Sequence, residues 1–356
     1  MPASSVRAAR RTTALIALSI SALLLVGCAN SSSATSDAGA ESSDSMPAAE
    51  GHATYPLTLE SPYGETVLQE RPTRIAAIVP NASDTELLFS LGVTPVLSSS
   101  LVTEGGYLTE YGAETVDTYE FVVGEDIPVE AIAASDPDLI VAVGWLGGLA
   151  GVSLSDYYDR LSTIAPVLAS PETSQALVSP WQDSIGLIGE ALDLSDAADA
   201  VIDDYETQLS DLRDAHPEFD GLTGTWTIYY GAGTGLQYLS QPDSAPAEFL
   251  EELGFAPNPG AAAFSADPTV SDELLSKIDA DVIVLGQSAH ASDAEFAGVV
   301  DGSLFQNLGA VSAGHLVTLP PRTDDGWDPL WAITSGGPIG NAKAAQYVAP
   351  LLADVL

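Results

Sequence analysis

A loop near the C-terminus carries the side chains that are best suited to holding a ligand. It has the sequence PPRTDDGWDPLW and follows the apolar run HLVTL, so it leaves the carboxyl end of a predicted strand. In it, Arg322 is followed by Trp327 and Trp331, two of only five tryptophans. A guanidinium forms charge-assisted hydrogen bonds, and indole rings stack on flat or cationic groups. The loop therefore suits an anionic or polar ligand, unless Arg322 pairs with Asp324 or Asp325 and the tryptophans only pack.

Other candidate ligand contacts follow predicted strands in the same way. Asn81 comes after RIAAIV, Trp145 comes after DLIVAV and stands close to two glycines, and a tyrosine pair ends TWTIYY. In a parallel sheet, a ligand pocket lies beyond the carboxyl ends of the strands. The glycines predict that the Trp145 ring is uncovered. Side chains alternate along a strand, so one of Tyr229 and Tyr230 faces the pocket, and the sequence leaves open which one.

No catalytic motif stands out. The sequence contains neither the Gly-x-Ser-x-Gly turn of serine hydrolases nor the Gly-x₄-Gly-Lys-[Ser/Thr] phosphate loop, and nothing singles out a carboxylate pair among its 50 acids. The four histidines, His52, His216, His290 and His315, are scattered. A bare zinc or manganese ion needs several ligands that converge within about 2.0–2.3 Å. We therefore expect a binding protein with no catalytic residue, cofactor or metal ligand, and keep an exported hydrolase and a bare-metal receptor as alternatives.

Strand-like and helix-like segments alternate along the chain. Residues 74–79, 138–143 and 281–285 are apolar runs suited to buried strands, and apolar-periodic segments such as 83–92 lie between runs of this kind. Such alternation predicts mostly parallel sheets that are covered by helices. The expected fold class is therefore α/β.

Two passages share one plan. PVEAIAASDPDLIVAVG places Glu130 eight residues before Asp138, and VSDELLSKIDADVIVLG places Glu273 eight residues before Asp281. Each glutamate stands in the first turn of a predicted helix, where the positive end of the helix dipole stabilises an acid. The repeat predicts two similar lobes, although two unrelated βα units would also account for it.

A long amphipathic helix is predicted between the two passages. Its apolar positions keep a helical period from Ala198 to Leu212, Ser195 can cap its start, and His216 and Pro217 end it. About twenty residues at 1.5 Å each make a rod of about 30 Å. We expect this rod to join the lobes, with an ordinary packing helix of the second lobe as the alternative. The predicted divisions are an N-terminal lobe at 55–180, an interlobe helical segment at 181–219 and a C-terminal lobe at 220–356.

The single cysteine, Cys28, stands where an exported lipoprotein has one. Arginines precede an uncharged apolar stretch at 12–27 that is too short for an ordinary membrane-spanning helix. The residues LVGC resemble the lipobox, in which cleavage before the cysteine exposes a thiol that receives diacylglycerol. We expect a signal peptide at 1–27, a lipid on Cys28 at the outer face of the cell membrane, and a flexible tether at 28–54. An incidental cysteine is the alternative, and the Sec and twin-arginine export routes both stay open.

The composition limits the partners. Seven lysines and arginines and 50 acids follow residue 27, which gives the mature chain a net charge of −43. Such a surface repels nucleic acids and anionic lipids. Because 46% of the residues are apolar, the chain can still build cores. We expect a monomer that contacts the membrane through its lipid anchor alone and binds no nucleic acid.

Together these features resemble the periplasmic-binding-protein family that serves iron–siderophore, haem and cobalamin importers. The resemblance rests on the lipobox, the polar tether, RIAAIVPNASDTELLFSLGVTPV, the two repeated passages and the long helix, and its folded part covers roughly residues 70–350. It implies a receptor of two α/β lobes joined by one long helix. Such a receptor captures a metal chelate in its cleft and delivers it to an ABC permease with its ATPase. The implied ligand is a ferric siderophore, with cobalamin or haem as alternatives.

The resemblance also implies roles for particular residues. One glutamate per lobe docks onto arginines of the permease, and here these are Glu130 and Glu273. The candidate ligand contacts remain the side chains that leave the strands: Asn81, Trp145, Tyr229, Tyr230, Arg322, Trp327 and Trp331. A triply anionic catecholate complex needs several cations, and Arg322 is the only obvious one. A hydroxamate or mixed siderophore is therefore favoured.

Overall fold

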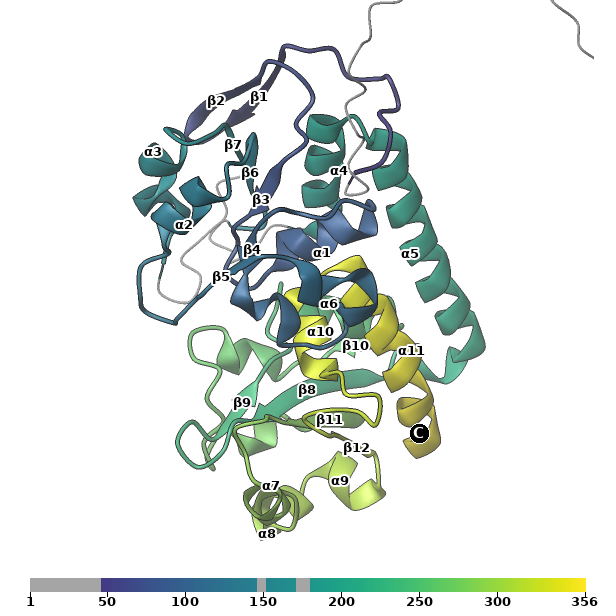
Figure 1. The fold of residues 1–356 in the computed structure, drawn as a ribbon. Helices are drawn as coiled ribbons and strands as arrows, with labels where there is room; N and C mark the ends of the chain where they lie inside the picture. The colour runs from purple at the N-terminus through teal and green to yellow at the C-terminus, as the bar shows by residue number, and fades with distance from the viewer. Residues whose placement is uncertain (1–45, 146–151, 171–179) are drawn as a thin grey trace, which may run out of the picture. The chain divides into compact units, whose positions relative to one another are not determined.

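The computed structural model describes residues 46–145, 152–170 and 180–356. The predicted signal peptide, Cys28 and most of the predicted tether lie outside the described residues. The described residues belong to one compact unit, Ser43–Leu356. Within that unit the strands gather in an upper and a lower group in Figure 1, which confirms the predicted α/β fold of two lobes. No helix in the described ranges is both long and apolar enough to cross a membrane.

The N-terminal lobe is built around a parallel sheet of strand order β3-β6-β7. An antiparallel hairpin (β1-β2) and a short parallel pair (β4-β5) complete its strands. The strands are β1 (Leu57–Ser61), β2 (Gly64–Leu68), β3 (Ile75–Ala77), β4 (Ser98–Ser99), β5 (Thr118–Tyr119), β6 (Leu139–Ala142) and β7 (Val167–Ala169). The helices are α1 (Ser83–Ser90), α2 (Val129–Ala134) and α3 (Tyr158–Leu161). All residues of β3 and β6 are buried, as expected for strands that are covered on both faces.

The C-terminal lobe has a larger sheet of strand order β10-β8-β11-β12, in which these pairings are parallel and β9 lies antiparallel to β8. The strands are β8 (Thr223–Tyr229), β9 (Leu236–Tyr238), β10 (Ala256–Pro257), β11 (Val282–Gln287) and β12 (Leu316–Leu319). The helices are α6 (Ala245–Glu252), α7 (Asp293–Val300), α8 (Ser303–Gln306), α9 (Gly309–Ala313), α10 (Pro329–Ser335) and α11 (Pro338–Val355).

Short 3₁₀ helices connect many of these elements. In the described ranges they are η1 (Ser100–Thr103), η2 (Thr109–Tyr111), η3 (Ala113–Thr115), η4 (Leu154–Asp156), η5 (Pro217–Phe219), η6 (Ala261–Phe264) and η7 (Leu275–Lys277).

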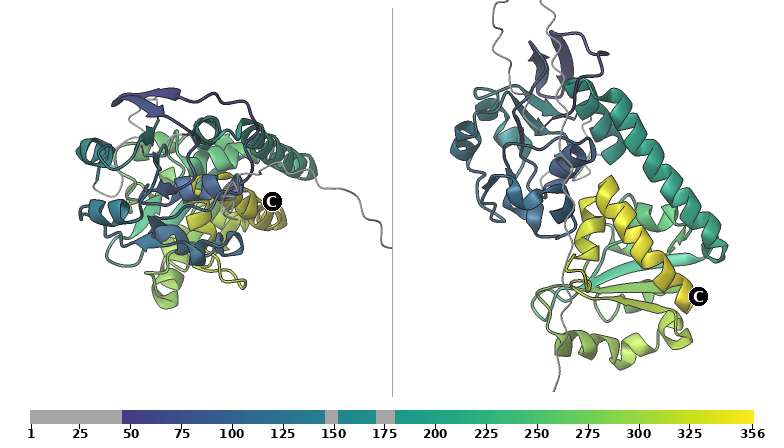
Figure 2. Two further views of the ribbon diagram at one scale, coloured as in Figure 1. Left: turned by 45° about the horizontal axis from the view of Figure 1, so that its top comes forward. Right: turned by 45° about the vertical axis from the view of Figure 1, so that its right-hand side comes forward.

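The predicted interlobe segment consists of two helices, α4 (Trp181–Leu192) and α5 (Ser195–Ala215). Helix α4 packs against α1 of the N-terminal lobe. The 21 residues of α5 span about 30 Å, and α5 runs beside both lobes in the right-hand view of Figure 2. Helix α11 contacts both α5 and α1. One apolar cluster includes buried residues of both lobes, so a continuous core holds them together.

The two lobes share a detail that supports the repeat in the sequence. Asp138 Oδ2 accepts hydrogen bonds from Thr73 N at 2.9 Å and from Thr73 Oγ1 at 3.0 Å. Asp281 Oδ2 accepts the same two bonds from Thr223, at 2.8 and 2.7 Å. In each lobe the aspartate that precedes one strand thus ties down the threonine at the start of the neighbouring parallel strand.

The two repeated glutamates differ in their local structure. Glu130 lies in the first turn of α2, as predicted. Glu273 lies in a turn that precedes the three-residue helix η7. The predicted helix around Glu273 is therefore wrong, and a helix dipole does not act on that carboxylate. The apolar residues that follow Glu273, Leu274 and Leu275, pack against a core cluster without forming an α-helix.

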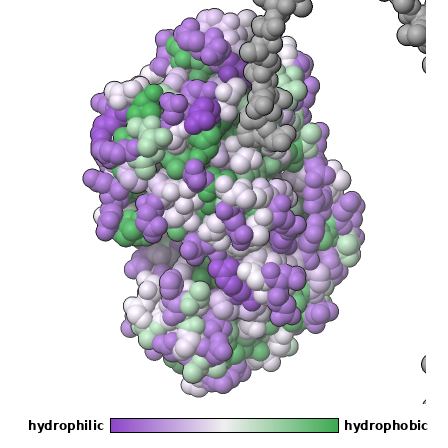
Figure 3. Space-filling model, viewed as in Figure 1, coloured by the Kyte–Doolittle hydropathy of each residue, from purple (hydrophilic) through white to green (hydrophobic). Residues whose placement is uncertain are grey.

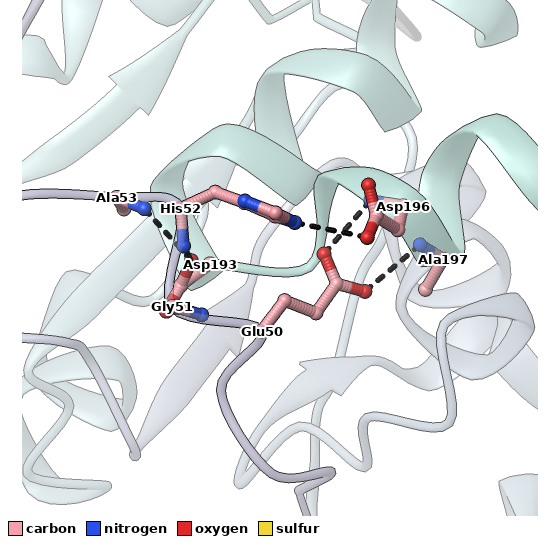
Figure 4. A network of polar contacts seen from close by, with 7 residues as sticks. All are labelled: Glu50, Gly51, His52, Ala53, Asp193, Asp196 and Ala197. Atoms are coloured by element: carbon pink, nitrogen blue, oxygen red, sulfur yellow. Dashed lines mark hydrogen bonds and ion pairs between the residues drawn. The ribbon is translucent and has the colours of Figure 1, made fainter.

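The end of the predicted tether is bound to the folded unit (Figure 4). The Asp193 carboxylate accepts backbone N–H bonds from Gly51, His52 and Ala53, each at 2.8 Å. The Glu50 carboxylate accepts those of Asp196 at 2.8 Å and the next residue at 2.9 Å, in the first turn of α5. The prediction that the flexible tether extends to residue 54 is therefore wrong for residues 50–53, which are bound to the folded unit. Ser195 is not the cap of α5 but its first residue, and the Glu50 carboxylate takes the place of a local side-chain cap.

Candidate functional site

The carboxyl ends of the parallel strands in both lobes mark the candidate site. The loops that leave β3 and β6 in the N-terminal lobe, and β8, β11 and β12 in the C-terminal lobe, start at these ends. Figure 3 shows a hollow between the two lobes at the left edge of the view. A ligand pocket is expected at the edge of a sheet where parallel strands end, because neighbouring loops can diverge there.

Arg322 bridges the two lobes. Its Nη2 donates to the backbone oxygen of Glu104 at 2.8 Å, and its Nη1 donates to that of Gly326 at 2.9 Å. Nearby, Asp328 N donates to Gly105 O at 2.8 Å. The Arg322 guanidinium thus binds two backbone carbonyls. The sequence suggested either a free cation or an ion pair with a neighbouring acid, and the structure shows neither. Arg322 joins the two rims of the cleft.

The expectation of an uncovered Trp145 ring is wrong. This side chain is 1% exposed and belongs to the apolar core of the N-terminal lobe. Its Nε1 donates to Val152 O at 3.4 Å, and its ring lies 6.3 Å from that of Tyr157. The two glycines that motivated the prediction lie outside the described residues. Trp145 therefore acts as a packing residue in this structure, and its ligand contact stays a prediction.

The structure separates the tyrosine pair. Tyr229 is buried in the core cluster on one face of the C-terminal sheet, with Phe264. Tyr230 follows β8 and is only partly buried. Burial and the nearby Asp328 carboxylate raise the pKa of Tyr230, so its hydroxyl stays protonated as a hydrogen-bond donor. Tyr230 is therefore the better candidate of the two for a ligand contact.

The remaining predicted contacts also differ in exposure. Trp327 is buried against Tyr347, with ring centroids 5.5 Å apart, and Lys343 Nζ lies 5.5 Å from its ring. Trp331 is partly exposed. Asn81 is partly exposed at the exit of β3, and its Oδ1 accepts the Ser83 N–H at 3.2 Å. The structure thus leaves Asn81, Tyr230, Arg322 and Trp331 accessible, whereas it buries Trp145, Tyr229 and Trp327.

A cavity of about 210 Å³ lies between the lobes beside Asp84. The oxygens of Asp84 accept Val143 N at 2.8 Å and Gly144 N at 2.9 Å, which ties α1 to the end of β6. Burial raises the pKa of Asp84 to about 7. The lining residues come from both lobes and α4: Ser83, Asp84, Leu87, Gly144, Pro180, Trp181, Ser184, Asp243, Ala245, Glu248, Glu252, Ser335, Gly336, Gly337 and Asn341. Sequence reasoning missed most of this set, because the residues are far apart in the chain.

A second buried acid, Glu86, connects the lobes. Its Oε1 accepts Gly340 N at 2.8 Å, in the first turn of α11, and its Oε2 accepts the Tyr107 hydroxyl at 2.7 Å. Burial raises the pKa of Glu86 to about 7, and these hydrogen bonds oppose that shift. The positive end of an 18-residue helix also favours the carboxylate. Glu86 therefore fixes α1 of one lobe to α11 of the other.

The two predicted docking glutamates are available for contact. The Glu130 side chain is 87% exposed, with Oε1 3.6 Å from Arg160 Nη2. An exposed pair at this distance contributes little to stability and leaves the carboxylate accessible. Glu273 is also exposed. Docking to a permease stays a prediction for both residues.

Among the described residues, one group offers three metal-type ligands, namely Glu50, His52 and Asp196. Figure 4 shows that these side chains are already engaged: Glu50 caps α5, and His52 Nε2 lies 2.9 Å from Asp196 Oδ2. The hydrogen bond to Asp196 raises the pKa of His52. The positive end of α5 also disfavours a cation here. We interpret this group as a set of contacts that fixes the N-terminal segment to the start of α5.

Comparisons with known proteins agree with this architecture. The chain matches the family described as periplasmic binding protein over residues 78–323. A probable siderophore-binding lipoprotein of Bacillus subtilis (strain 168), YfiY, is 27% identical over 289 residues, which cover 78% of this chain and 80% of that protein.

Solved structures share the fold at lower identity. Staphylococcus aureus SirA complexed with staphyloferrin B is 19% identical, with a TM-score of 0.65, and the match covers 83% of this chain and 98% of that chain. Streptococcus pneumoniae PiaA in complex with ferrichrome is 24% identical, with a TM-score of 0.63, and the match covers 84% and 98%. At these identities the likeness shows the fold alone. Because the family match spans more than half of the chain and confirms the resemblance in the sequence, this chain belongs to the periplasmic binding protein family.

Proposed function

We propose that this protein captures a ferric siderophore outside the cytoplasm and delivers it to the permease of an ABC importer. The observation that carries the proposal is the family match over residues 78–323, combined with a cavity that residues of both lobes line. The Bacillus subtilis relative YfiY, a probable siderophore-binding lipoprotein, supports the ligand class. Lipidation of Cys28 at the outer face of the membrane is part of the same proposal.

The placement of the cations supports a hydroxamate or mixed siderophore. The seven lysines and arginines after residue 27 all lie in the described ranges. Five of them bind protein groups: Arg71, Arg74, Arg160, Arg322 and Lys343. The other two, Arg213 and Lys277, precede β8 and β11, at the opposite edge of the sheet from the strand exits. A triply anionic catecholate complex would thus meet a single cation, Arg322, at the strand exits, and the guanidinium of Arg322 already donates to two backbone carbonyls.

The delivery step follows from the connections between the lobes. Helices α5 and α11, the Glu86 contacts and the Arg322 contacts together restrict how far the lobes can separate. Capture therefore depends on a largely preformed cleft. Release requires the permease to bind both lobes, through Glu130 and Glu273, and to favour a more open arrangement.

A fluorescence titration tests the proposal. The chain from residue 29 onward is titrated with ferric hydroxamates, ferric catecholates, haem and cobalamin, and quenching of its five tryptophans is followed. We expect saturable quenching by a ferric hydroxamate, without turnover of the ligand. Saturable quenching by haem or cobalamin alone would show that the protein is a haem or cobalamin receptor instead. If none of the chelates binds, the proposal is refuted.

A further inference from the structure

The cavity beside Asp84 presents oxygen atoms that have no hydrogen-bond partner. In the described part of the chain, the side-chain oxygens of Ser83, Ser184 and Asn341 are buried and unpaired, and all three residues line this cavity. Each Asp84 carboxylate oxygen accepts one backbone N–H, so lone pairs remain on both. Buried polar groups are nearly always paired, so these atoms indicate an occupant. The serine hydroxyls can donate or accept, but the Asn341 amide oxygen and the ionised Asp84 carboxylate can only accept, so the occupant has to donate hydrogen bonds.

The charges around the cavity specify the sign of that occupant. Its lining includes the acids Asp84, Asp243, Glu248 and Glu252, and neither a lysine nor an arginine is among the described lining residues. Burial raises the pKa of Glu248, and the nearby Glu251 and Asp243 raise it further. Burial also raises the pKa of Glu252, which accepts the hydroxyl of Tyr205. A positively charged donor would relieve this crowding of acids.

The volume decides how much of a ligand enters. Pockets that enclose a whole small molecule measure about 300–1,000 Å³, whereas this cavity measures about 210 Å³. It is too small for a complete ferric siderophore but accommodates an ammonium group on a short alkyl chain. Its lining includes Ser83 and Gly144, which follow β3 and β6, so it lies beside the strand exits where the chelate is expected.

We propose that this cavity receives a protonated amine arm of the bound chelate, so that the preferred ligand is a ferric hydroxamate with a free terminal amine. The inference rests on the proposed function, because the arm belongs to a chelate held in the same interlobe cleft. The ammonium group donates its three hydrogens to Asp84 and to the unpaired oxygens of Ser184 and Asn341. No covalent step is involved.

A matched pair of ligands tests the inference. Ferrioxamine B, a linear ferric trihydroxamate with a free amine, is compared with its N-acetylated form by fluorescence titration at one ionic strength. We expect the free amine to bind at least tenfold more tightly. The Glu248→Gln and Ser184→Ala variants should reduce this ratio at least threefold. Glu190→Gln, at an exposed position of α4 outside the cavity lining, removes one negative charge and should keep the ratio, so it serves as the control for the general negative charge of the protein.

The outcomes separate the two proposals. Equal binding of both ligands, or a ratio that falls equally in the control variant, would overturn the amine site while the proposed function stands. If methylammonium chloride raises the melting temperature above that in sodium chloride but both ligands bind equally, the cavity holds a free cation and the amine-arm inference is wrong. Failure of all ferric chelates to bind would instead refute the proposed function.

Discussion

The buried contact of Glu86 makes a quantitative prediction about pH. The pKa of this carboxyl rises from an ordinary 4.5 to about 7 on folding. An acid with a raised pKa contributes stability that is fully present below about pH 4.5 and is lost as the pH rises to about 7, because the folded state binds the proton more tightly. At 1.36 kcal/mol per pKa unit, the loss is about 3 kcal/mol.

Replacing Glu86 with Gln isolates this effect. Glutamine retains the shape of the side chain, an acceptor for Gly340 N and a hydrogen-bonding group for Tyr107, but it does not titrate. The free energy of unfolding of both proteins is measured by urea denaturation from pH 4.5 to pH 8. We expect the variant to gain about 3 kcal/mol relative to the original protein over this range. Because Asp84 titrates in both proteins, its contribution largely cancels in the difference.

A control with the opposite sign sharpens this test. The hydrogen bond from Lys343 lowers the pKa of the exposed Glu110. Its contribution to stability is present above its ordinary pKa and is lost as the pH falls. Glu110→Gln should therefore lose stability slightly, relative to the original protein, as the pH rises. A difference between Glu86→Gln and the original protein that stays flat, or falls with rising pH, would refute the assignment of Glu86 as a buried carboxyl that titrates near pH 7.

Three further variants, one of them a double substitution, test other parts of the structure. Changing Glu130 and Glu273 together to Ala should leave chelate affinity within about twofold but abolish uptake by cells, and lost affinity would show a structural role. Glu50→Ala removes the acceptor of two N–H groups in the first turn of α5 and should cost about 0.5–2 kcal/mol in thermal unfolding, whereas Glu190→Ala on exposed α4 surface should not. Equal effects would contradict the capping role. Gly144→Ala places a methyl group 2.7 Å from a serine oxygen and 2.8 Å from a carboxylate oxygen, and should destabilise the protein by about 1–3 kcal/mol. An unchanged melting temperature would show that α1 adjusts freely.

Local sequence patterns predicted the elements whose stability is mainly local or apolar. The rod helix was expected from Ser195 to His216, and α5 spans Ser195–Ala215, because its periodic residues Ala198, Tyr205 and Leu209 are buried. Its cap was missed, since the cap comes from a glutamate 146 residues earlier in the chain. The helix around Glu273 was overpredicted, because the apolar residues after it pack without completing a helical turn.

The site was harder to predict, because its geometry depends on contacts between distant segments. Glu86 and Gly340 are 254 residues apart, and the sequence shows no sign of their hydrogen bond. Arg322 was identified as a functional candidate from its type and position, but its carbonyl partner in the other lobe was not. For Trp145, two neighbouring glycines indicated exposure, whereas apolar side chains from elsewhere in the lobe bury the ring.

Hydrogen exchange with and without a bound ferric hydroxamate tests the central claim most directly. If the chelate is held between strand exits of both lobes, the ligand will protect amides after β3, in residues 81–83, and after β8 and β12, in residues 230–233 and 322–331. Protection confined to one lobe, or to the opposite edge of the sheets, would contradict an interlobe binding site.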